Sequence, residues 1–161
     1  ALPYLAPAGT PYFDTVTPGA VLGLRLTTKR GDILRALLEG LALEMRLNLE
    51  ILAEAGVPVE NLRAVGGGAR SDWWNQLKAD AVNRPVIVPD VTEAGCLGAA
   101  MLACAAHTGA DTAALAKSWV RPRKEFAPRQ DAAALYTARY AAYRNLYPAL
   151  RDFTRRQKLG Q

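Results

Sequence analysis

The sequence predicts an α/β domain with at least two parallel strands, because strand-like and helix-like segments alternate along its middle part. Of its 161 residues 50% are hydrophobic and 22% are charged, which is enough apolar material for a sizeable core. We expect a single domain over residues 1–161. No apolar run reaches the roughly 20 residues that cross a bilayer, and no charged-then-apolar leader opens the chain. We therefore expect a cytoplasmic protein with no membrane contact.

The first part of the chain predicts a loop, a short strand and a long helix. Residues 1–18 are rich in proline, glycine and threonine, which is typical of an ordered loop. Residues 20–26 alternate enough to predict a short strand, interrupted by Gly23. Apolar residues then recur at steps of three and four, so we expect one long helix, capped by Thr28 and ended by Gly56.

The middle of the chain alternates between strands and helices. The expected elements are a strand over 61–65, a helix over 72–82 capped by Ser71, a buried strand over 85–88, and an alanine-rich helix over 93–107 capped by Thr92. The second helix offers four side chains to the core, namely Trp73, Trp74, Leu77 and Ala81.

The last part predicts a small helix over 112–118, an extended stretch over 119–128, and a long helix from about residue 130 with a kink at Pro148. Tyrosines recur along this last helix at steps of three and four, which indicates a stripe that docks on a core. They are Tyr136, Tyr140, Tyr143 and Tyr147.

The net charge of +5 comes from two local groups of basic residues. The first group is Arg121, Arg123, Lys124 and Arg129, and the second is Arg139, Arg144, Arg151, Arg155, Arg156 and Lys158. Because the second group lies beside the tyrosine stripe, we expect a solvated basic face, not a nucleic-acid interface. A nucleic-acid binder is the weakest of three functional hypotheses; its mark would be an affinity that falls steeply with salt.

The cysteines and the histidine predict no disulfide and no metal centre. Cys96 and Cys104 are eight residues apart in one predicted helix, too far along it to bridge, so we expect buried reduced thiols. His107 is the only histidine and has no second ligand at a suitable spacing.

The most informative motif is the junction from Val65 to Ser71, VGGGARS. A strand that ends in glycines and leads into a helix presents unhindered N–H groups at a positively polarised helix end, which suits a phosphate or a nucleotide. The motif does not match the dinucleotide fingerprint, since Ser71 stands at the third glycine position, and the chain has no P-loop triplet. A purely structural turn remains the alternative interpretation.

Several spaced motifs around this junction resemble the FGGY carbohydrate kinases and, among them, the xylulokinase-like branch. The junction itself belongs to LRAVGGGARS, and it is followed by Ala79-Asp80, Pro85-Val86 and TEAGCLGAA at 92–100. Upstream, Gly19-x-Val21-x-Gly23-Leu24 and, seven residues later, Asp32-Ile33-x-x-Ala36-Leu37-Leu38-Glu39 look like a second family signature. Pro3-Tyr4-Leu5 and Thr10-Pro11-Tyr12-Phe13-Asp14 are also similar. The family commonly has Gly-Glu-Arg where this chain has Pro7-Ala8-Gly9.

The resemblance implies an actin/Hsp70/hexokinase-like (ribonuclease H-like) ATPase fold, of which this chain is the C-terminal, nucleotide-binding half. It assigns ATP or ADP, with Mg²⁺ held mainly through the nucleotide, to the glycine turn. The nucleotide-binding residues it implies are Gly66, Gly67, Gly68, Ala69, Arg70 and Ser71. Within this set, Ser71 stands on the adenine side, and Arg70 either packs over the base or is an exposed arginine at a helix start.

In the family, the phosphate hairpin, the sugar pocket and the catalytic aspartate lie upstream of the matched stretch. None of the five tempting aspartates, Asp14, Asp32, Asp72, Asp80 and Asp90, matches the base motif, so we expect no catalytic residue in this chain. The chain starts at Ala1, which suggests a fragment or a processed chain whose N-terminal sugar-binding domain is absent. Alone, it is expected to be inactive.

Two main hypotheses follow. In the first, the chain belongs to an ATP-dependent kinase of a ketopentose such as xylulose, which meets its sugar through the N-terminal domain and forms a homodimer. In the second, it is a nucleotide-binding or regulatory module without catalysis.

Overall fold

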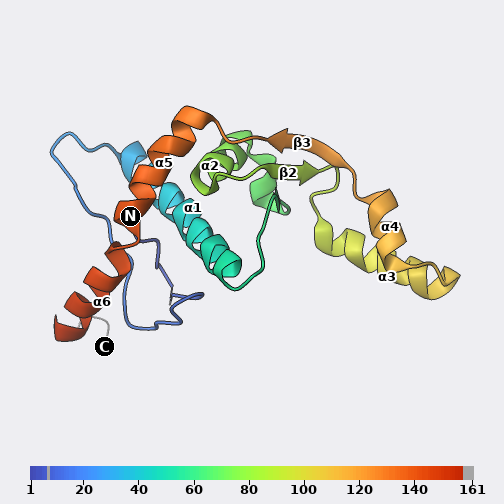
Figure 1. Cartoon of the computed structure of the whole chain (residues 1–161), viewed down its shortest axis with the longest axis horizontal. Helices are drawn as coiled ribbons and strands as arrows, with labels where there is room; N and C mark the ends of the chain where they lie inside the picture. The colour runs from blue at the N-terminus through green and yellow to red at the C-terminus, as the bar shows by residue number, and fades with distance from the viewer. Residues whose placement is uncertain (7, 158–161) are drawn as a thin grey trace. The chain divides into compact units, whose positions relative to one another are not determined.

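The computed structural model describes residues 1–6 and 8–157, so Pro7 and Lys158 lie outside the described residues. The chain divides into two compact units (Figure 1). Unit 1 combines Ala1–Val59 with Gln130–Gln161, and unit 2 is Glu60–Arg129. Each unit is described by itself, and a single domain over 1–161 stays a prediction.

Unit 2 is built on a three-stranded sheet with the order β1-β2-β3. The strands are β1 (Leu62–Arg63), β2 (Val86–Pro89) and β3 (Pro122–Phe126). β1 runs parallel to β2, with Leu62 opposite Val86, which confirms the predicted parallel pair. β3 runs antiparallel to β2, with Phe126 opposite Val86, and the two arrows point in opposite directions in Figure 1.

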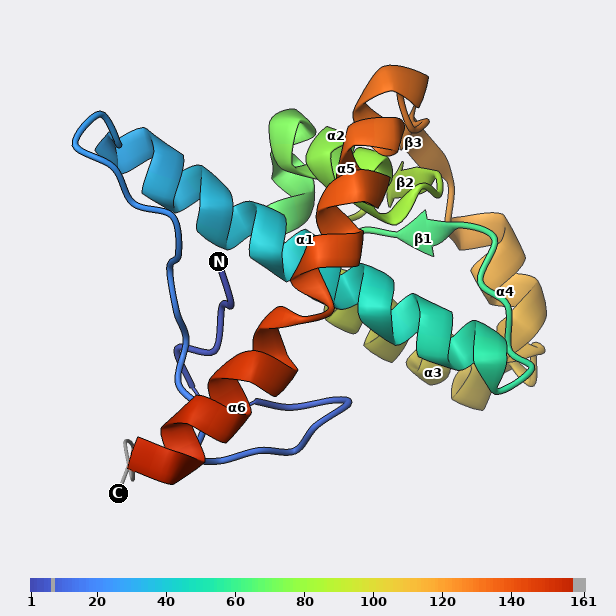
Figure 2. The ribbon, with the colours of Figure 1, turned by 60° about the vertical axis from the view of Figure 1, so that its left-hand side comes forward.

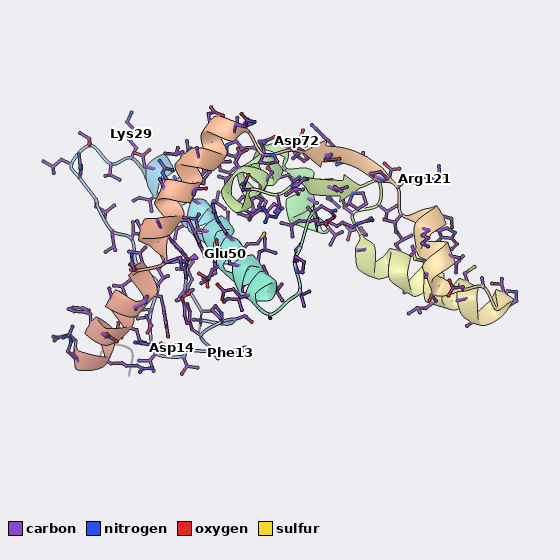
Figure 3. The ribbon with its side chains drawn as sticks, viewed as in Figure 1. Phe13, Asp14, Lys29, Glu50, Asp72 and Arg121 are labelled. Carbon is purple, nitrogen blue, oxygen red and sulfur yellow. The ribbon has the colours of Figure 1, made fainter. Side chains whose placement is uncertain are left out.

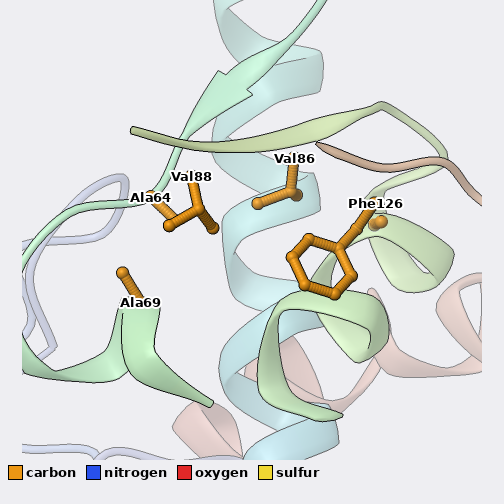
Figure 4. Close-up of a cluster of buried hydrophobic side chains, with 6 residues drawn as sticks. Ala64, Ala69, Val86, Val88 and Phe126 are labelled. Carbon is orange, nitrogen blue, oxygen red and sulfur yellow. The ribbon is translucent and has the colours of Figure 1, made fainter. Parts of the chain in front are cut away.

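Apolar side chains from several elements of unit 2 meet in one core. The helices of this unit are η1 (Gly67–Arg70), α2 (Asp72–Val82), α3 (Ala94–Thr108) and α4 (Thr112–Trp119). The core cluster, most of it labelled in Figure 4, consists of Ala64, Ala69, Ala79, Val86, Val88 and Phe126. Because β2 places Val86 and Val88 on the same face, that face of the sheet packs against η1 and α2.

The predicted cap of α2 is confirmed, whereas that of α3 is wrong. The Ser71 hydroxyl oxygen accepts a hydrogen bond from the Trp74 N–H at 3.3 Å. Glu93, and not Thr92, precedes α3 as its N-cap. Thr92 instead uses its carbonyl, which accepts from the Gly66 N–H at 2.7 Å. The residue type suited a cap, but the connection to the glycine turn decides the role of Thr92.

Two burial predictions in unit 2 are wrong. Trp73 is 52% exposed, because it lies on the outer side of α2, while Leu77 and Ala81 are buried as expected. Cys96 is exposed and Cys104 is partly buried. In α3 only Met101 is buried among the described residues. A helix that is apolar on all sides does not show in its sequence which side faces the core.

Unit 1 is helical, and the cap of its first helix lies one residue later than predicted. Its helices are α1 (Arg30–Glu54), α5 (Gln130–Tyr143) and α6 (Leu146–Gln157). The N-cap of α1 is Lys29, whose N–H donates to the Asp32 carboxylate at 2.8 Å. The Thr28 hydroxyl, the predicted cap, accepts from the Arg25 N–H instead. Gly56, with φ of +82°, follows the end of the helix as expected.

The strand predicted over residues 20–26 does not form. Ala20 makes an isolated antiparallel bridge with Leu2, and nothing else in the segment pairs. Leu22, Leu24 and Leu26 are exposed. The alternating pattern is therefore present, but among the described residues no neighbouring strand covers it. Residues 1–6 and 8–18 form the expected loop apart from the Leu2 bridge.

The tyrosine stripe docks on the core of unit 1, as predicted. All four tyrosines are buried, and each hydroxyl donates to a carboxylate. The pairs are Tyr136–Glu39 at 3.0 Å, Tyr140–Glu50 at 2.8 Å, Tyr143–Glu44 at 2.6 Å and Tyr147–Asp14 at 2.9 Å. We call these four pairs the tyrosine ladder. Figure 2 draws α5 across α1, and Figure 3 labels Glu50 and Asp14.

The terminal helix breaks earlier than predicted. The chain turns at Arg144 and Asn145, between α5 and α6, and Pro148 lies in the first turn of α6, where proline is tolerated. Arg139 and Arg144 are exposed, as expected for the basic face, and form ion pairs with Glu39 at 2.8 Å and Glu50 at 3.8 Å. No described helix is both long and apolar enough to cross a membrane.

Candidate functional site

The glycine turn begins with a backbone conformation that favours glycine. After β1, the Ala64 N–H donates to the Ile87 carbonyl at 2.9 Å, which keeps the chain on the sheet as far as the turn. Gly66 then adopts a φ of +76°, a region that L side chains rarely occupy. Its N–H donates to the Thr92 carbonyl at 2.7 Å. Gly66 therefore has a purely structural reason to be glycine.

Gly67 and Gly68 have no such reason. Neither has a positive φ, and a Cβ added to Gly67 would meet nothing within 4 Å. A Cβ on Gly68 would make an ordinary contact of 3.6 Å with the indole ring of Trp74. Both residues are exposed, and their N–H groups find no acceptor within the described part of the chain. These two residues therefore form an open stretch of bare backbone with two free donors.

Ala69 fixes the turn to the core of unit 2. Its side chain is 1% exposed and belongs to the core of unit 2. Its carbonyl accepts a hydrogen bond from the side-chain amide of Asn75 at 2.8 Å. The turn is thus fixed at Gly66 by the Thr92 carbonyl and at Ala69 by Asn75, and the two open glycines lie between these points.

Arg70 and Ser71 complete the predicted set. The Arg70 guanidinium lies 2.9 Å from the Glu93 carboxylate, and its side chain is 69% exposed. The ion pair links the turn to the residue that precedes α3, within unit 2. Ser71 is exposed, and its hydroxyl oxygen caps α2. All six predicted residues therefore lie in one continuous strand-to-helix connection.

Two side chains of α2 add features that the sequence did not reveal. Burial lowers the pKa of Lys78, whose ammonium lies 5.4 Å from the centre of the Trp74 ring. Trp74 in turn faces Gly68. Asn75 is fully buried, on the same face of α2 as the buried Ala79 and Val82. The only signal for Asn75 in the sequence was this polar residue inside a buried helix face.

Comparison with known proteins decides the family. The model of the FGGY family of carbohydrate kinases, C-terminal domain, matches residues 1–107. The chain belongs to this family. The xylulose kinase of Bacillus subtilis (strain 168) is 30% identical over 151 residues, which cover 93% of this chain and 30% of that protein. The gluconokinase of Bacillus licheniformis is 32% identical, with 93% and 29% covered.

Solved structures of FGGY kinases share this fold. The xylulose kinase from Brucella ovis matches with a TM-score of 0.85 and 36% identity, over 94% of this chain and 32% of that one. The xylulose kinase from Lactobacillus acidophilus matches with a TM-score of 0.82 and 26% identity, over 92% of this chain and 30% of that one. The predicted fold class, an actin/Hsp70/hexokinase-like kinase fold, is confirmed, and the part of that fold present is the C-terminal domain. The chain spans about 30% of the length of the curated relatives.

Four of the five candidate aspartates, all but Asp90, have a carboxylate with hydrogen-bond or ion-pair partners in the described residues. Asp80 is fully buried and accepts from the Arg129 guanidinium at 2.6 Å and its backbone N–H at 2.8 Å. Asp32 caps α1, Asp72 pairs with Lys124 at 2.6 Å, and the Asp90 N–H donates to the Arg121 carbonyl.

Asp14 is buried in unit 1. Hydrogen bonds from the Thr17 hydroxyl and the Val16 N–H hold its pKa below the ordinary range, against the opposing effect of burial. Residues 1–6 and 8–157 contain no group of three His, Cys, Asp or Glu side chains suited to a metal ion.

Proposed function

We propose that this chain is the nucleotide-binding part of an ATP-dependent sugar kinase, which transfers the γ-phosphate to a hydroxyl of a ketopentose or a related sugar. The observation that carries the proposal is the open stretch at Gly67 and Gly68. Their Cβ positions are free or in ordinary contact, so packing does not require glycine there. Membership of the FGGY kinases supports the proposal that an adenine nucleotide binds to this bare backbone.

The turn fits an adenine nucleotide by its donors and its shape. A side chain at Gly67 would project into open space, where a base or ribose would otherwise lie against the backbone. The free N–H groups of Gly67 and Gly68 precede the N-terminus of α2, where the helix dipole favours an anion such as the α-phosphate. ATP supplies the phosphoryl group that is transferred, and Mg²⁺ would be held mainly through its phosphates, as in phosphoryl transfer generally.

The parts that act on the sugar are proposed to lie in another domain. Phosphoryl transfer needs a carboxylate near the acceptor hydroxyl and a site that excludes water. Four of the five candidate aspartates, all but Asp90, serve as a cap, as ion-pair partners or as acceptors of several hydrogen bonds. We therefore propose that a sugar-binding N-terminal domain supplies the base, and that this chain alone is inactive.

A ketopentose is favoured by the structural likeness to xylulose kinases, one of which reaches a TM-score of 0.85. The xylulose kinase of Bacillus subtilis and the gluconokinase of Bacillus licheniformis act on different acceptors by their names, yet they are similarly identical to this chain, at 30% and 32%. This similarity supports the proposal that the contacts that select the sugar lie outside the chain. A homodimer stays a prediction.

The test is phosphorylation by the complete gene product. A panel of ketopentoses, alditols and aldonates is mixed with ATP and Mg²⁺, and ADP release is followed. We expect turnover with at least one ketopentose. ADP binding without turnover on any acceptor would favour the second hypothesis, a nucleotide-binding module without catalysis. Absence of both would contradict the proposal.

A further inference from the structure

A single buried amide holds one end of the glycine turn. The Asn75 Nδ2 donates to the Ala69 carbonyl at 2.8 Å, across six residues, and Asn75 itself is 0% exposed. In a planar trans peptide the C=O and the following N–H point in opposite directions. The hydrogen bond from Asn75 therefore also fixes the direction of the Arg70 N–H. It thereby fixes the backbone orientation of η1 just after Gly67 and Gly68.

The other atom of the same amide has no partner. The Asn75 Oδ1 is buried, and it is the single such side-chain atom without a hydrogen bond in the described part of the chain. A buried acceptor without a donor lowers the stability of the folded state. An apolar residue of similar volume would remove this cost, but it would also leave the buried Ala69 carbonyl without its donor. The two effects on fold stability oppose each other, and the one group that the Asn75 amide serves is the peptide of the glycine turn.

We propose that Asn75 is a positioning residue for the nucleotide. It fixes the Ala69 peptide so that Gly67 and Gly68 are held in the geometry that the ligand meets, while it does not touch the ligand itself. The inference rests on the proposed function, because it requires that a nucleotide binds at the glycine turn. It goes further in assigning nucleotide affinity to a residue outside the turn.

The chain offers matched controls at the next two positions. Asn75→Leu removes the amide at nearly constant volume. Gln76→Leu makes the same change one residue later, where the amide donates to the Ala127 carbonyl at 2.9 Å and not to the turn. Leu77 is buried, and Leu77→Ala creates a core defect while the Asn75 amide stays in place. Each variant of the complete gene product is titrated with ADP by calorimetry, and its unfolding midpoint is measured.

If Asn75 positions the turn, ADP affinity and the unfolding midpoint should not change in parallel across the variants. Asn75→Leu should weaken ADP binding at least fivefold and lower the unfolding midpoint less than Leu77→Ala does. Gln76→Leu should keep the affinity within twofold, and Leu77→Ala should keep it although its midpoint falls further. If Asn75→Leu proves poorly folded, the ADP affinity and the unfolding midpoint of Asn75→Ala are compared with those of Leu77→Ala instead.

Equal affinity of wild type and the Asn75 variants would overturn the inference and leave the proposed function standing. The inference would also be overturned if the losses of affinity followed the midpoints across all variants. A wild-type protein that does not bind ADP would overturn the proposed function, and the inference with it.

Discussion

The tyrosine ladder and the glycine turn use polar groups in opposite ways. In the ladder, each hydroxyl has a carboxylate partner, and Glu44 accepts from both Tyr143 and Tyr4. In the turn, two N–H groups face outward without an acceptor within the described residues. Paired groups hold a fold together, whereas unpaired donors on exposed bare backbone are available to a ligand. The difference separates a structural region from the proposed binding region in the same chain.

The largest expected effect is at the end of the ladder. Asp14 accepts from the Thr17 hydroxyl at 2.6 Å, from Tyr147 at 2.9 Å and from two backbone N–H groups. Asp14→Ala leaves these donors without an acceptor and should lower the free energy of unfolding by about 3 kcal/mol. Urea denaturation measures this loss. If ADP affinity below the unfolding transition fell as well, the separation of the two regions would break.

A smaller effect is expected at Tyr143. Its hydroxyl donates to the Glu44 carboxylate at 2.6 Å. Tyr143→Phe should therefore lower the free energy of unfolding by about 2 kcal/mol. A change below about 0.5 kcal/mol in the same denaturation measurement would show that the ladder does not stabilise the fold in the way described.

The same tyrosines predict a loss of stability at high pH. Burial and the hydrogen bond to Glu44 raise the pKa of Tyr143, and burial and Glu50 raise that of Tyr140. A raised pKa in the folded state means that the stabilisation is complete below the ordinary value of about 10 and is lost as pH rises above it. The free energy of unfolding should therefore decline above pH of about 10, and less steeply in Tyr143→Phe. Parallel declines would argue against the raised pKa.

The smallest effect is expected at Arg70. Its ion pair with Glu93 is exposed on both sides, and such pairs contribute about 0.5 kcal/mol or less. Arg70→Ala should leave the unfolding midpoint nearly unchanged. Any loss of ADP affinity in this variant would then report a contact with the ligand, which distinguishes packing over the base from an exposed arginine at a helix start.

The sequence predicted those features that local chemistry decides. Ser71 as the cap of α2 and the buried β-branched strand depend on neighbours in the sequence, and both are confirmed. Features that depend on distant partners were missed. The leucines after Ala20 lack a neighbouring strand, and the apolar helix α3 exposes Cys96.

The same distinction applies to the candidate site. The glycine motif marks the turn itself, because Gly66 needs its positive φ and Gly67 is open. The hydrogen bond from Asn75 to Ala69 joins residues six apart and depends on how α2 packs under η1. No local pattern predicts such a bond, so the turn was found from the sequence and its support was not.

The central claim is that bare backbone at Gly67 receives an adenine nucleotide. Calorimetric titration of the complete gene product with ADP, as wild type, Gly67→Val and Gly31→Val, tests it most directly. Gly31 also has no atom within 4 Å of an added Cβ and no positive φ, but it lies at the start of α1. We predict at least a tenfold loss for Gly67→Val, about 1.4 kcal/mol, with no loss for Gly31→Val and similar unfolding midpoints. Equal ADP affinity in all three proteins would contradict the claim.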